Sequence, residues 1–492
     1  MKPPTALRLP FPRRDVAASL VVFLVALPLC VGVAVASGVP AELGLITGIV
    51  GGLVTGLLPG SSLQVSGPAA GLTVLVFEAV QRFGLGALGA IVLAAGLLQV
   101  ALGLLRMGRW FRAISVAVVE GMLAGIGLTI IAGQLYAMAD AKAPGTGHGK
   151  LTGLPGLFTG GLGSRPALTA FALGAATIAL LALWPRLPAK VRAVPAPLAA
   201  VLLATAATAA FDLPVHKLNV QGLLGAVQPP GAGELARLLE AGVLGTVLAF
   251  ALISSAESLF SAAAIDRMHD GPRTRYDKEL VAQGVGNTVC GALGALPMTS
   301  VIVRSSANVH AGARTKASRV LHGLWLLLFA ALLPGVLELI PLASLAGVLV
   351  YTGWRLMPLR QLPPLWRDHR GEAVILVVTA LAVVMLNLFE GVLLGLLLAV
   401  VKSAWETSHV HLEVDDSGTG AVNVKVLGNA TFLRLPKMLD TLEALPADRP
   451  VVLDLSGLRH LDHACRTALL AWSEEHNRPH LQAPLLTPLV PR

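Results

Sequence analysis

The chain has 492 residues, of which 55% are hydrophobic and 13% are charged, whereas an ordinary soluble protein carries roughly 25% charged residues. A soluble chain this apolar would have to hide most of its surface, so the composition places the protein in a lipid bilayer. Cysteines at positions 30, 290 and 465 are too few and too scattered for a disulfide framework or a zinc site. The net charge of +9 fits either nucleic-acid binding or basic loops on one side of a membrane.

Apolar runs bounded by charged residues, glycine or proline predict about fourteen transmembrane spans. Most runs approach the roughly 20 residues that a helix needs to cross a bilayer, but the third and the tenth are short. The predicted spans are 15–37, 41–59, 66–80, 86–106, 113–135, 167–184, 195–211, 243–264, 278–295, 299–311, 319–338, 341–358, 372–387 and 389–406. The first run lacks a cleavage motif, so we expect no cleavable signal peptide.

The loops divide into two classes by charge. Loops that follow even-numbered spans are rich in basic residues, such as Arg106 and Arg109 after the fourth span and Arg314, Lys316 and Arg319 after the tenth. Loops that follow odd-numbered spans carry far fewer. The positive-inside rule therefore places the even-numbered loops and both termini in the cytoplasm. The basic charge is a topology signal, and we expect no nucleic-acid partner.

Two glycine–proline interruptions mark the short third and tenth spans. They are QVSGPAAGLTV at 64–74 and GALPMTSVIV at 294–303. Seven spans precede the eighth, and an odd number reverses orientation, so residues 15–211 and 243–406 are predicted to be inverted repeats. In secondary transporters, corresponding broken segments in the two halves indicate a substrate site near the membrane midplane.

Each interruption is predicted to begin a half-helix whose first backbone N–H groups have no partner within the helix. Such a helix start carries roughly half a positive elementary charge. Two of them that face each other near the membrane centre would form an anion site without a fully charged ligand residue. The alternative is that SGP and LPMT are tight turns at the membrane surface.

Three of the ionisable residues within or beside predicted spans are candidates for a function. Glu257 lies within the eighth span, where insertion of a carboxylate costs roughly 3 kcal/mol; it either binds a proton or a sodium ion, or packs against Ser254 or Ser258. Arg304 either adds positive charge behind the site, balances Glu257, or extends to the inner membrane surface. Glu42 begins the second span, where it takes part in ion coupling or caps the helix.

The composition changes after about residue 407. The segment 411–428 is typical of two strands joined by a glycine-containing turn, and the segment 450–476 is typical of a buried strand, a turn and an amphipathic helix. We therefore expect a transmembrane domain at 1–407 and a small cytoplasmic α/β domain at 408–492, apparently truncated, whose proline-rich end has little structure.

Signals of enzymatic chemistry are weak. The histidines show no metal-binding spacing, and no Ser/His/Asp or Cys/His set is visible. The match of GLGALG at 84–89 to a dinucleotide motif follows no strand. We expect no enzyme activity, no catalytic residues, no metal and no cofactor.

Several segments resemble the SulP (sulfate permease) family of anion transporters, which carry a C-terminal STAS domain. These segments are GVPAELGL at 38–45, QVSGPAAGLTV at 64–74, AESLFSAAAIDR at 256–267, KELVAQGVGN at 278–287 and LPMTSVIVRSSANVHAGARTKAS at 296–318. The last is long and specific. VVLDLSGLRHLD at 451–462 is a looser match to the STAS signature.

The resemblance implies two inverted repeats of seven spans, plus a STAS-like domain. Spans 1–4 and 8–11 form a core domain that moves like an elevator against a gate domain of spans 5–7 and 12–14. The substrate then lies between the starts of half-helices 3 and 10, flanked by spans 1 and 8. The implied substrate-binding residues are Leu29, Cys30, Val33, Ser66, Gly67, Pro68, Ala69, Ala70, Thr299, Ser300, Val301 and Ile302. Glu257 matches a coupling-ion carboxylate, and Arg304 matches the arginine of the RSxAN motif.

Two positions depart from the family pattern. Where many relatives have LPQG in the first span, this chain has LPLC, with Leu29 and Cys30, which leaves room for a carboxylate with an apolar middle. Where relatives have a D-S-S-G loop in the STAS domain, this chain has Asp462-His463-Ala464-Cys465. We therefore do not expect phosphorylation of this loop, and we expect the domain to have a structural or assembly role.

We therefore predict a secondary active transporter that takes up an anion with a proton by alternating access. The candidate substrates are inorganic oxyanions such as sulfate, bicarbonate, and small carboxylates or dicarboxylates. The alternatives are a sodium-coupled symporter, an anion exchanger, a nucleobase:cation symporter of the uracil permease type, and a STAS-based membrane sensor or scaffold. We expect a homodimer in the bacterial inner membrane.

Overall fold

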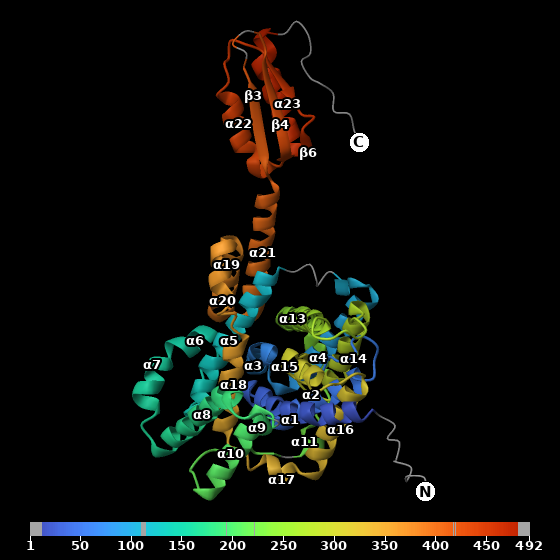
Figure 1. Cartoon of the computed structure of the whole chain (residues 1–492), viewed down its shortest axis with the longest axis vertical. Coiled ribbons are helices and arrows are strands. Elements are labelled where there is room, and N and C mark those ends of the chain that lie inside the picture. The colour runs from blue at the N-terminus through green and yellow to red at the C-terminus, as the bar shows by residue number, and fades with distance from the viewer. Residues whose placement is uncertain are drawn as a thin grey trace. The chain divides into compact units, whose positions relative to one another are not determined.

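Helices occupy the positions at which the sequence predicts spans (Figure 1). The computed structural model describes residues 12–109, 115–192, 194–220, 222–416, 418 and 420–480. The expected N-terminal segment 1–11 and the proline-rich end 481–492 lie outside these ranges. The chain divides into two compact units, Met1–Leu396 and Leu397–Arg492.

The helices at the predicted spans have the following bounds. They are α1 (Arg13–Ala36), α2 (Ala41–Val50, continued by a π-helical turn at Gly51–Thr55), α3 (Thr73–Phe83), α4 (Leu85–Leu104), α5 (Val116–Met138), α8 (Arg165–Leu183), α10 (Ala196–Ala210), α13 (Ala241–Asp266), α14 (Tyr276–Ala292), α15 (Ile302–His310), α16 (Ala317–Leu332), α18 (Leu342–Leu356), α20 (Arg370–Met385) and α21 (Leu388–Thr407). Shorter helices in the connections are α6 (Gly147–Thr152), α7 (Leu154–Gly156), α9 (Ala189–Arg192), α11 (Leu223–Ala226), α12 (Ala232–Ala236), α17 (Pro334–Leu337) and α19 (Leu362–Asp368).

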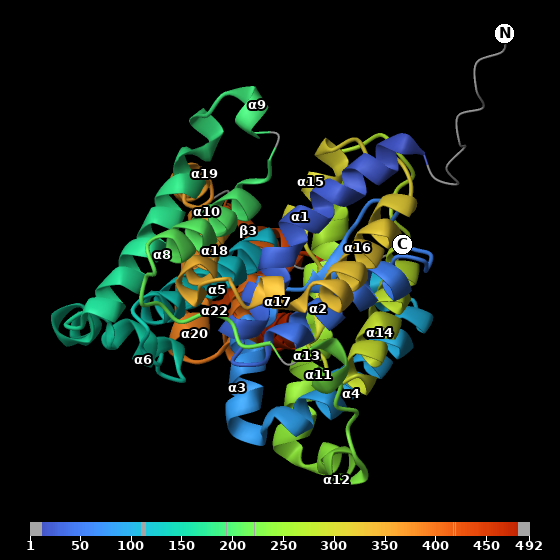
Figure 2. The same ribbon diagram turned by 90° about the horizontal axis from the view of Figure 1, so that it is seen from below.

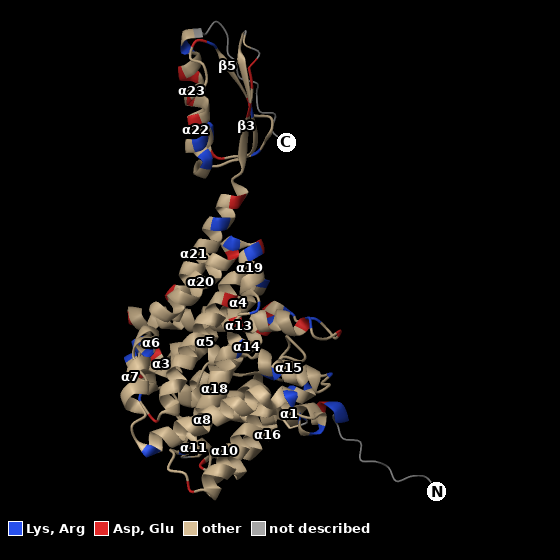
Figure 3. Cartoon of the chain, turned by 60° about the vertical axis from the view of Figure 1, so that its left-hand side comes forward, with Lys and Arg blue, Asp and Glu red and all other residues tan. Residues whose placement is uncertain are grey.

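Length and composition support a membrane location for this helical unit. Within the described residues, 6 helices are long and apolar enough to cross a membrane, and shorter apolar helices accompany them. Figure 3 shows that most of the helix bundle is uncharged, whereas charged residues take up a larger share of the second unit. Charged residues are expensive in lipid, so this distribution is the one a bilayer selects.

The packing of the two halves is reciprocal. Helix α4 of the first half packs against α13 and α14 of the second, and α16 of the second half packs against α1 and α2 of the first (Figure 2). In the same way α5 contacts α18 and α20, while α18 contacts α5 and α8. Exchange of corresponding helices between the halves reproduces these contacts, as inverted repeats require.

The two broken spans differ from the predicted half-helices at their beginnings. Residues Ser66–Pro68 form strand β1 and Met298–Ser300 form strand β2, and the two pair antiparallel. A short 3₁₀ turn at Ala70–Leu72 then leads into α3, and α15 begins at Ile302. The prediction of helix from residues 66 and 299 is therefore wrong by a few residues. Backbone groups away from water must be paired, and the strands pair them.

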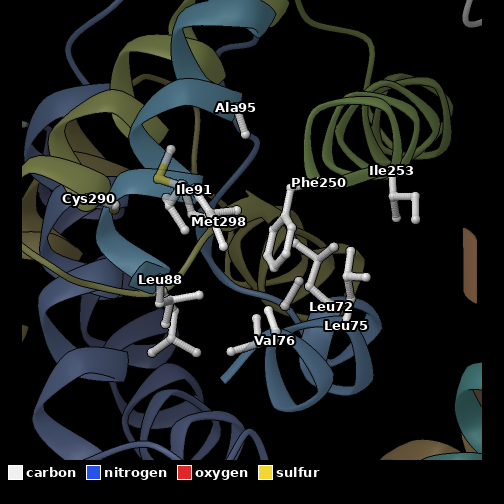
Figure 4. Packing of buried hydrophobic residues seen from close by; sticks show 14 of the residues in the cluster. Leu72, Leu75, Val76, Leu88, Ile91, Ala95, Phe250, Ile253, Cys290 and Met298 are labelled. Carbon is white, nitrogen blue, oxygen red and sulfur yellow. The ribbon is translucent and has the colours of Figure 1, made fainter. Parts of the chain in front are cut away.

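An apolar cluster holds half-helix α3 in place. Leu72 and Leu75 pack with Phe250 of α13, Ile91 of α4 and Met298 of β2 (Figure 4). Burial of a side chain of this size contributes roughly 1.5–3 kcal/mol. The start of α3 is therefore positioned by several buried contacts rather than by its own short length.

The second unit is a small α/β domain. Strand β4 (Val422–Ala430) pairs antiparallel with β3 (Val410–Asp415) and parallel with β5 (Val451–Asp454) and β6 (Leu458–Leu461). Helices α22 (Leu435–Glu443) and α23 (His463–Asn477) contribute Met438 and Leu469 to its core. The predicted hairpin, buried strand and amphipathic helix are confirmed.

Asp462 caps helix α23 in this domain. Its Oδ1 accepts a hydrogen bond from the backbone N–H of Cys465 at 2.7 Å, and its Oδ2 accepts one from that of Phe432 at 2.6 Å. The Cys465 N–H above all holds the pKa of Asp462 below its ordinary 3.8. A carboxylate with a lowered folded pKa stabilises above its unfolded pKa, and this contribution disappears on acidification below it.

We predict that Asp462→Ala destabilises α23 by about 1 kcal/mol at neutral pH, because the helix loses its cap. Hydrogen exchange of residues 463–477 in the full chain measures the effect. Asp440→Ala, an exposed aspartate on α22, is the matched control. Equal exchange in both variants at neutral pH would contradict the capping role.

Candidate substrate site

The strand pair brings together the two segments that the sequence singles out. Ser66 lies opposite Ser300, Gly67 opposite Thr299 and Pro68 opposite Met298. This register places the start of α3 beyond one end of the strand pair and the start of α15 beyond the other. The two positive helix ends therefore flank the strands instead of meeting directly, and the site contains strand backbone as well as helix starts.

Polar side chains from α14 hold the strand pair. Gln283 Nε2 lies 2.7 Å from Ser66 Oγ, 2.8 Å from Ser300 Oγ and 2.7 Å from Glu279 Oε1, and donates to this group of oxygens. Asn287 Nδ2 donates to the Met298 carbonyl at 3.0 Å, and its Oδ1 accepts from the Met298 N–H at 2.7 Å. These residues occupy one face of α14 because they recur every four positions.

This polar stripe of α14 is not among the residues predicted from the sequence, although the sequence contains a signal for it. Glu279, Gln283 and Asn287 all lie in the KELVAQGVGN segment of a predicted span. Polar residues at helical spacing in a membrane span face protein or water rather than lipid. The four-residue spacing of Glu279, Gln283 and Asn287 therefore indicates that the ninth span contacts polar groups, but it does not identify the segment that carries them.

We predict that Gln283→Leu lowers the thermal stability of the detergent-solubilised protein. Each buried polar group left without a partner costs about 1–3 kcal/mol, and Ser66, Ser300 and Glu279 all lose a donor. Thermal unfolding followed by tryptophan fluorescence measures this loss. Gln81→Leu, at an exposed position on α3, is the control, and equal stability of the two variants would remove the anchoring role of Gln283.

Glu257 on α13 lies against the start of α3. A Cβ atom placed on Gly71 would stand 2.8 Å from both carboxylate oxygens of Glu257. Oε2 of Glu257 is buried and has no hydrogen-bond partner among the described residues. The neighbouring Ser258 hydroxyl accepts a hydrogen bond from the Ser300 N–H at 3.2 Å. The carboxylate therefore lies beside the strand pair with one oxygen unpartnered among the described residues.

Arg304 lies behind the strand pair, with only 1% of its surface exposed. Its Nη2 donates to the Pro68 carbonyl at 3.2 Å, and a Cβ on Gly67 would overlap Nη1. The alternative in which Arg304 extends to the membrane surface is wrong, because the side chain is buried. Among the described residues it forms no ion pair with Glu257. The charge of Arg304 is therefore not neutralised by that carboxylate.

The predicted residues of the first span point in different directions. Cys30 is fully buried, and a Cβ on Gly48 of α2 would stand 2.7 Å from its Sγ. Leu29 instead lines a cleft described below, and Val33 packs in an apolar cluster with Ala69. Leu29, Cys30 and Val33 therefore have different surroundings, although they are close together on α1, and they do not contribute equally to one site.

The remaining predicted residues divide between the site and another region. Ala70 and Val301 are partly buried at the two helix starts, and Ile302 is 38% exposed. Glu42 is buried at the start of α2, where it lines a small cavity of about 40 Å³ with Leu85 of α4. That cavity shares no lining residue with the strand pair, so the structure does not group Glu42 with Glu257.

Comparison with known proteins decides the family. The model of the sulfate permease family matches residues 13–379, most of the chain. The chain belongs to the sulfate permease family. YvdB of Bacillus subtilis strain 168 is 29% identical over 413 residues, covering 81% of this chain and 75% of that protein. The bicarbonate transporter BicA of Picosynechococcus sp. is 28% identical over 424 residues, covering 82% and 72%.

Solved structures show the same fold for this sulfate permease family member. The transmembrane domain of a cyanobacterial bicarbonate transporter BicA matches with a TM-score of 0.65 and 25% identity, over 79% of this chain and 97% of that chain. The murine Slc26a9 anion transporter in the inward-facing state matches with a TM-score of 0.78 and 16% identity, over 97% and 86%. These matches confirm the predicted fold class, a helical membrane protein with inverted repeats and a small C-terminal α/β domain.

Proposed function

We propose that the protein is a secondary active transporter that moves an anion, together with a proton, by elevator-like alternating access. The observation that carries this proposal is the strand pair of the two broken spans. It sets the two positive helix starts at opposite ends of the strands and the buried Arg304 behind them. Such an arrangement favours a negative ligand. The proposed substrate-binding residues are those of 66–70 and 299–302.

Proton coupling is proposed on the position of Glu257. An ionised carboxylate so close to the start of α3 competes with an anionic substrate for the same positive helix end. Protonation removes that competition, so a proton and an anion bind together more readily than either alone. Sodium bound to the carboxylate would have the same electrostatic effect, and the two ions are distinguished by the imposed gradient.

The named relatives narrow the anions to be tested. BicA is named as a bicarbonate transporter, and a human relative that is 27% identical over 327 residues is named sulfate anion transporter 1. We propose sulfate and bicarbonate as first candidates. Small carboxylates and dicarboxylates are second candidates, because Leu29 gives the first span an apolar side chain at this position.

The test is uptake into proteoliposomes that contain the purified full chain. Labelled sulfate, bicarbonate, chloride and dicarboxylates are supplied with an imposed proton or sodium gradient. We expect one anion to accumulate only with an inward proton gradient. Accumulation with sodium alone overturns proton coupling. Competition by unlabelled uracil indicates a nucleobase transporter, and the absence of any flux overturns transport.

We also propose roles for the parts of the chain. Residues 1–407 form the transport domain, with core and gate as defined above, in a bacterial inner membrane. Residues 408–492 form a cytoplasmic STAS-like domain, and both termini lie in the cytoplasm because basic loops follow the even-numbered spans. A homodimer is proposed on the family resemblance, and its mass in detergent tests this.

A further inference from the structure

A cleft of about 530 Å³ opens between the core and gate helices. Helices α1 and α15 line one side of it, and α8, α10 and α18 line the other (Figure 2). The cleft includes the ends of α15 and α18 and the connection after α8. All three follow even-numbered spans, so under the positive-inside rule the cleft opens toward the cytoplasm.

The lining of the cleft is apolar but positively charged. Its walls include Val25, Leu181 and Tyr351, whereas its charged lining residues are Arg192 and Arg355, with no aspartate or glutamate. Neither arginine forms an ion pair or a side-chain hydrogen bond with any residue of the described chain. Both arginines are exposed, and two guanidinium groups without a carboxylate partner at the edge of an apolar surface fit a ligand with one anionic end and one apolar end.

The cleft adjoins the candidate substrate site at two points. Leu29 lines the cleft while its neighbour Cys30 is buried toward α2. Val303 lines the cleft with 37% of its surface exposed, while its neighbour Arg304 is buried behind the strand pair. The segment of α15 that lines the cleft is therefore the same segment that contacts the strand pair through Arg304.

We propose that this cleft is a second binding site, for a small organic anion whose charged end lies near Arg192 and Arg355 and whose apolar body lies along the walls. If this ligand is the transported anion, the inference rests on the proposed function, and the transported substrate is then an organic anion. The occupant is a soluble anion rather than a phospholipid, because the cavity has the size of small-molecule sites, roughly 300–1,000 Å³.

The probe is a series of alkanesulfonates of equal charge and increasing length. Methanesulfonate, butanesulfonate and hexanesulfonate stay ionised, so they carry no protons across a bilayer. Calorimetry measures their binding to the full chain in phosphatidylcholine nanodiscs, where both faces are accessible. We expect affinity to rise about three- to fourfold per methylene group buried. Equal affinity for the shortest and the longest member overturns the proposal.

Arginine variants test the charged end. Arg192→Gln combined with Arg355→Gln is expected to weaken hexanesulfonate binding about tenfold or more, since the variant loses both positive charges at the sulfonate end. Arg186→Gln combined with Arg360→Gln removes two exposed arginines outside the cleft and is expected to change nothing. Equal weakening by both pairs overturns the proposal, as does a phospholipid that copurifies with the wild type and is lost from the first pair.

A second variant tests the apolar body without changing the charge. Ala307 lines the cleft on α15, and Ala307→Phe is expected to weaken hexanesulfonate binding while methanesulfonate binding is retained. Equal loss of both contradicts the proposal. These measurements need no flux. Length-dependent binding in a chain that transports nothing overturns the proposed function alone, and transport without such binding overturns the cleft site alone.

Discussion

Glu257→Gln is expected to abolish gradient-driven uptake while anion exchange across the liposome membrane is retained. Glutamine has nearly the shape of glutamate, so the packing against Gly71 is kept, but it neither binds a proton nor carries a charge. A carboxylate within a span costs roughly 3 kcal/mol to insert, so the variant is also expected to fold and insert at least as well as the wild type. Accumulation driven by a proton gradient should fall to the equilibrium level.

The control for this experiment lies on the same helix. Glu240 is exposed at the start of α13, where it pairs with Arg237 at 3.2 Å. Glu240→Gln removes a carboxylate of α13 far from the strand pair, and uptake should stay at the wild-type level. If Glu257→Gln accumulates the anion as fast as wild type, the proton is carried elsewhere.

Much of the helical architecture could be predicted because hydrophobic length and loop charge are local signals. The meeting of the two broken segments could also be predicted, since SGP and LPMT break two spans at corresponding points. The sequence of neither interruption predicts a strand, because a segment of three residues is too short for an alternating hydrophobic pattern to be recognised. The strands form because two segments more than two hundred positions apart pair with each other, as Ser66 does with Ser300. The hydrogen bond from Gln283 to Ser66, 217 residues apart, holds this pair.

The rotation of α1 shows a second limit. This helix is apolar on every side, so its sequence gives no stripe that would assign one face to the core. The prediction of both Leu29 and Cys30 as substrate residues rests instead on the family pattern LPQG, which does not show how the helix is rotated. Their difference arises from packing: Gly48 and Leu326 enclose the Cys30 side, and a cleft is left on the Leu29 side.

Arg304→Gln is expected to raise the KM for the transported anion about tenfold to a hundredfold, because a charge-assisted hydrogen bond contributes roughly 1.5–3 kcal/mol. The arginine is buried, and its guanidinium contacts both the Gly67 backbone and the Pro68 carbonyl. Arg304→Lys keeps the charge but lacks the planar group that spans these two positions, so an intermediate KM is expected. Initial rates of uptake at varied anion concentration give KM and kcat separately.

A structural loss must be separated from an electrostatic one, since Gln at a buried position also leaves space. Thermal unfolding of each variant reports the structural part. Arg314→Gln, which removes an exposed arginine after α15, controls for the change in net charge. A raised KM in Arg304→Gln with partial recovery in Arg304→Lys, at similar unfolding temperatures, identifies the charge as the cause. A lowered kcat with an unchanged KM would instead show that Arg304 only supports the strand pair, and the anion would then be held by the helix starts and strand backbone alone.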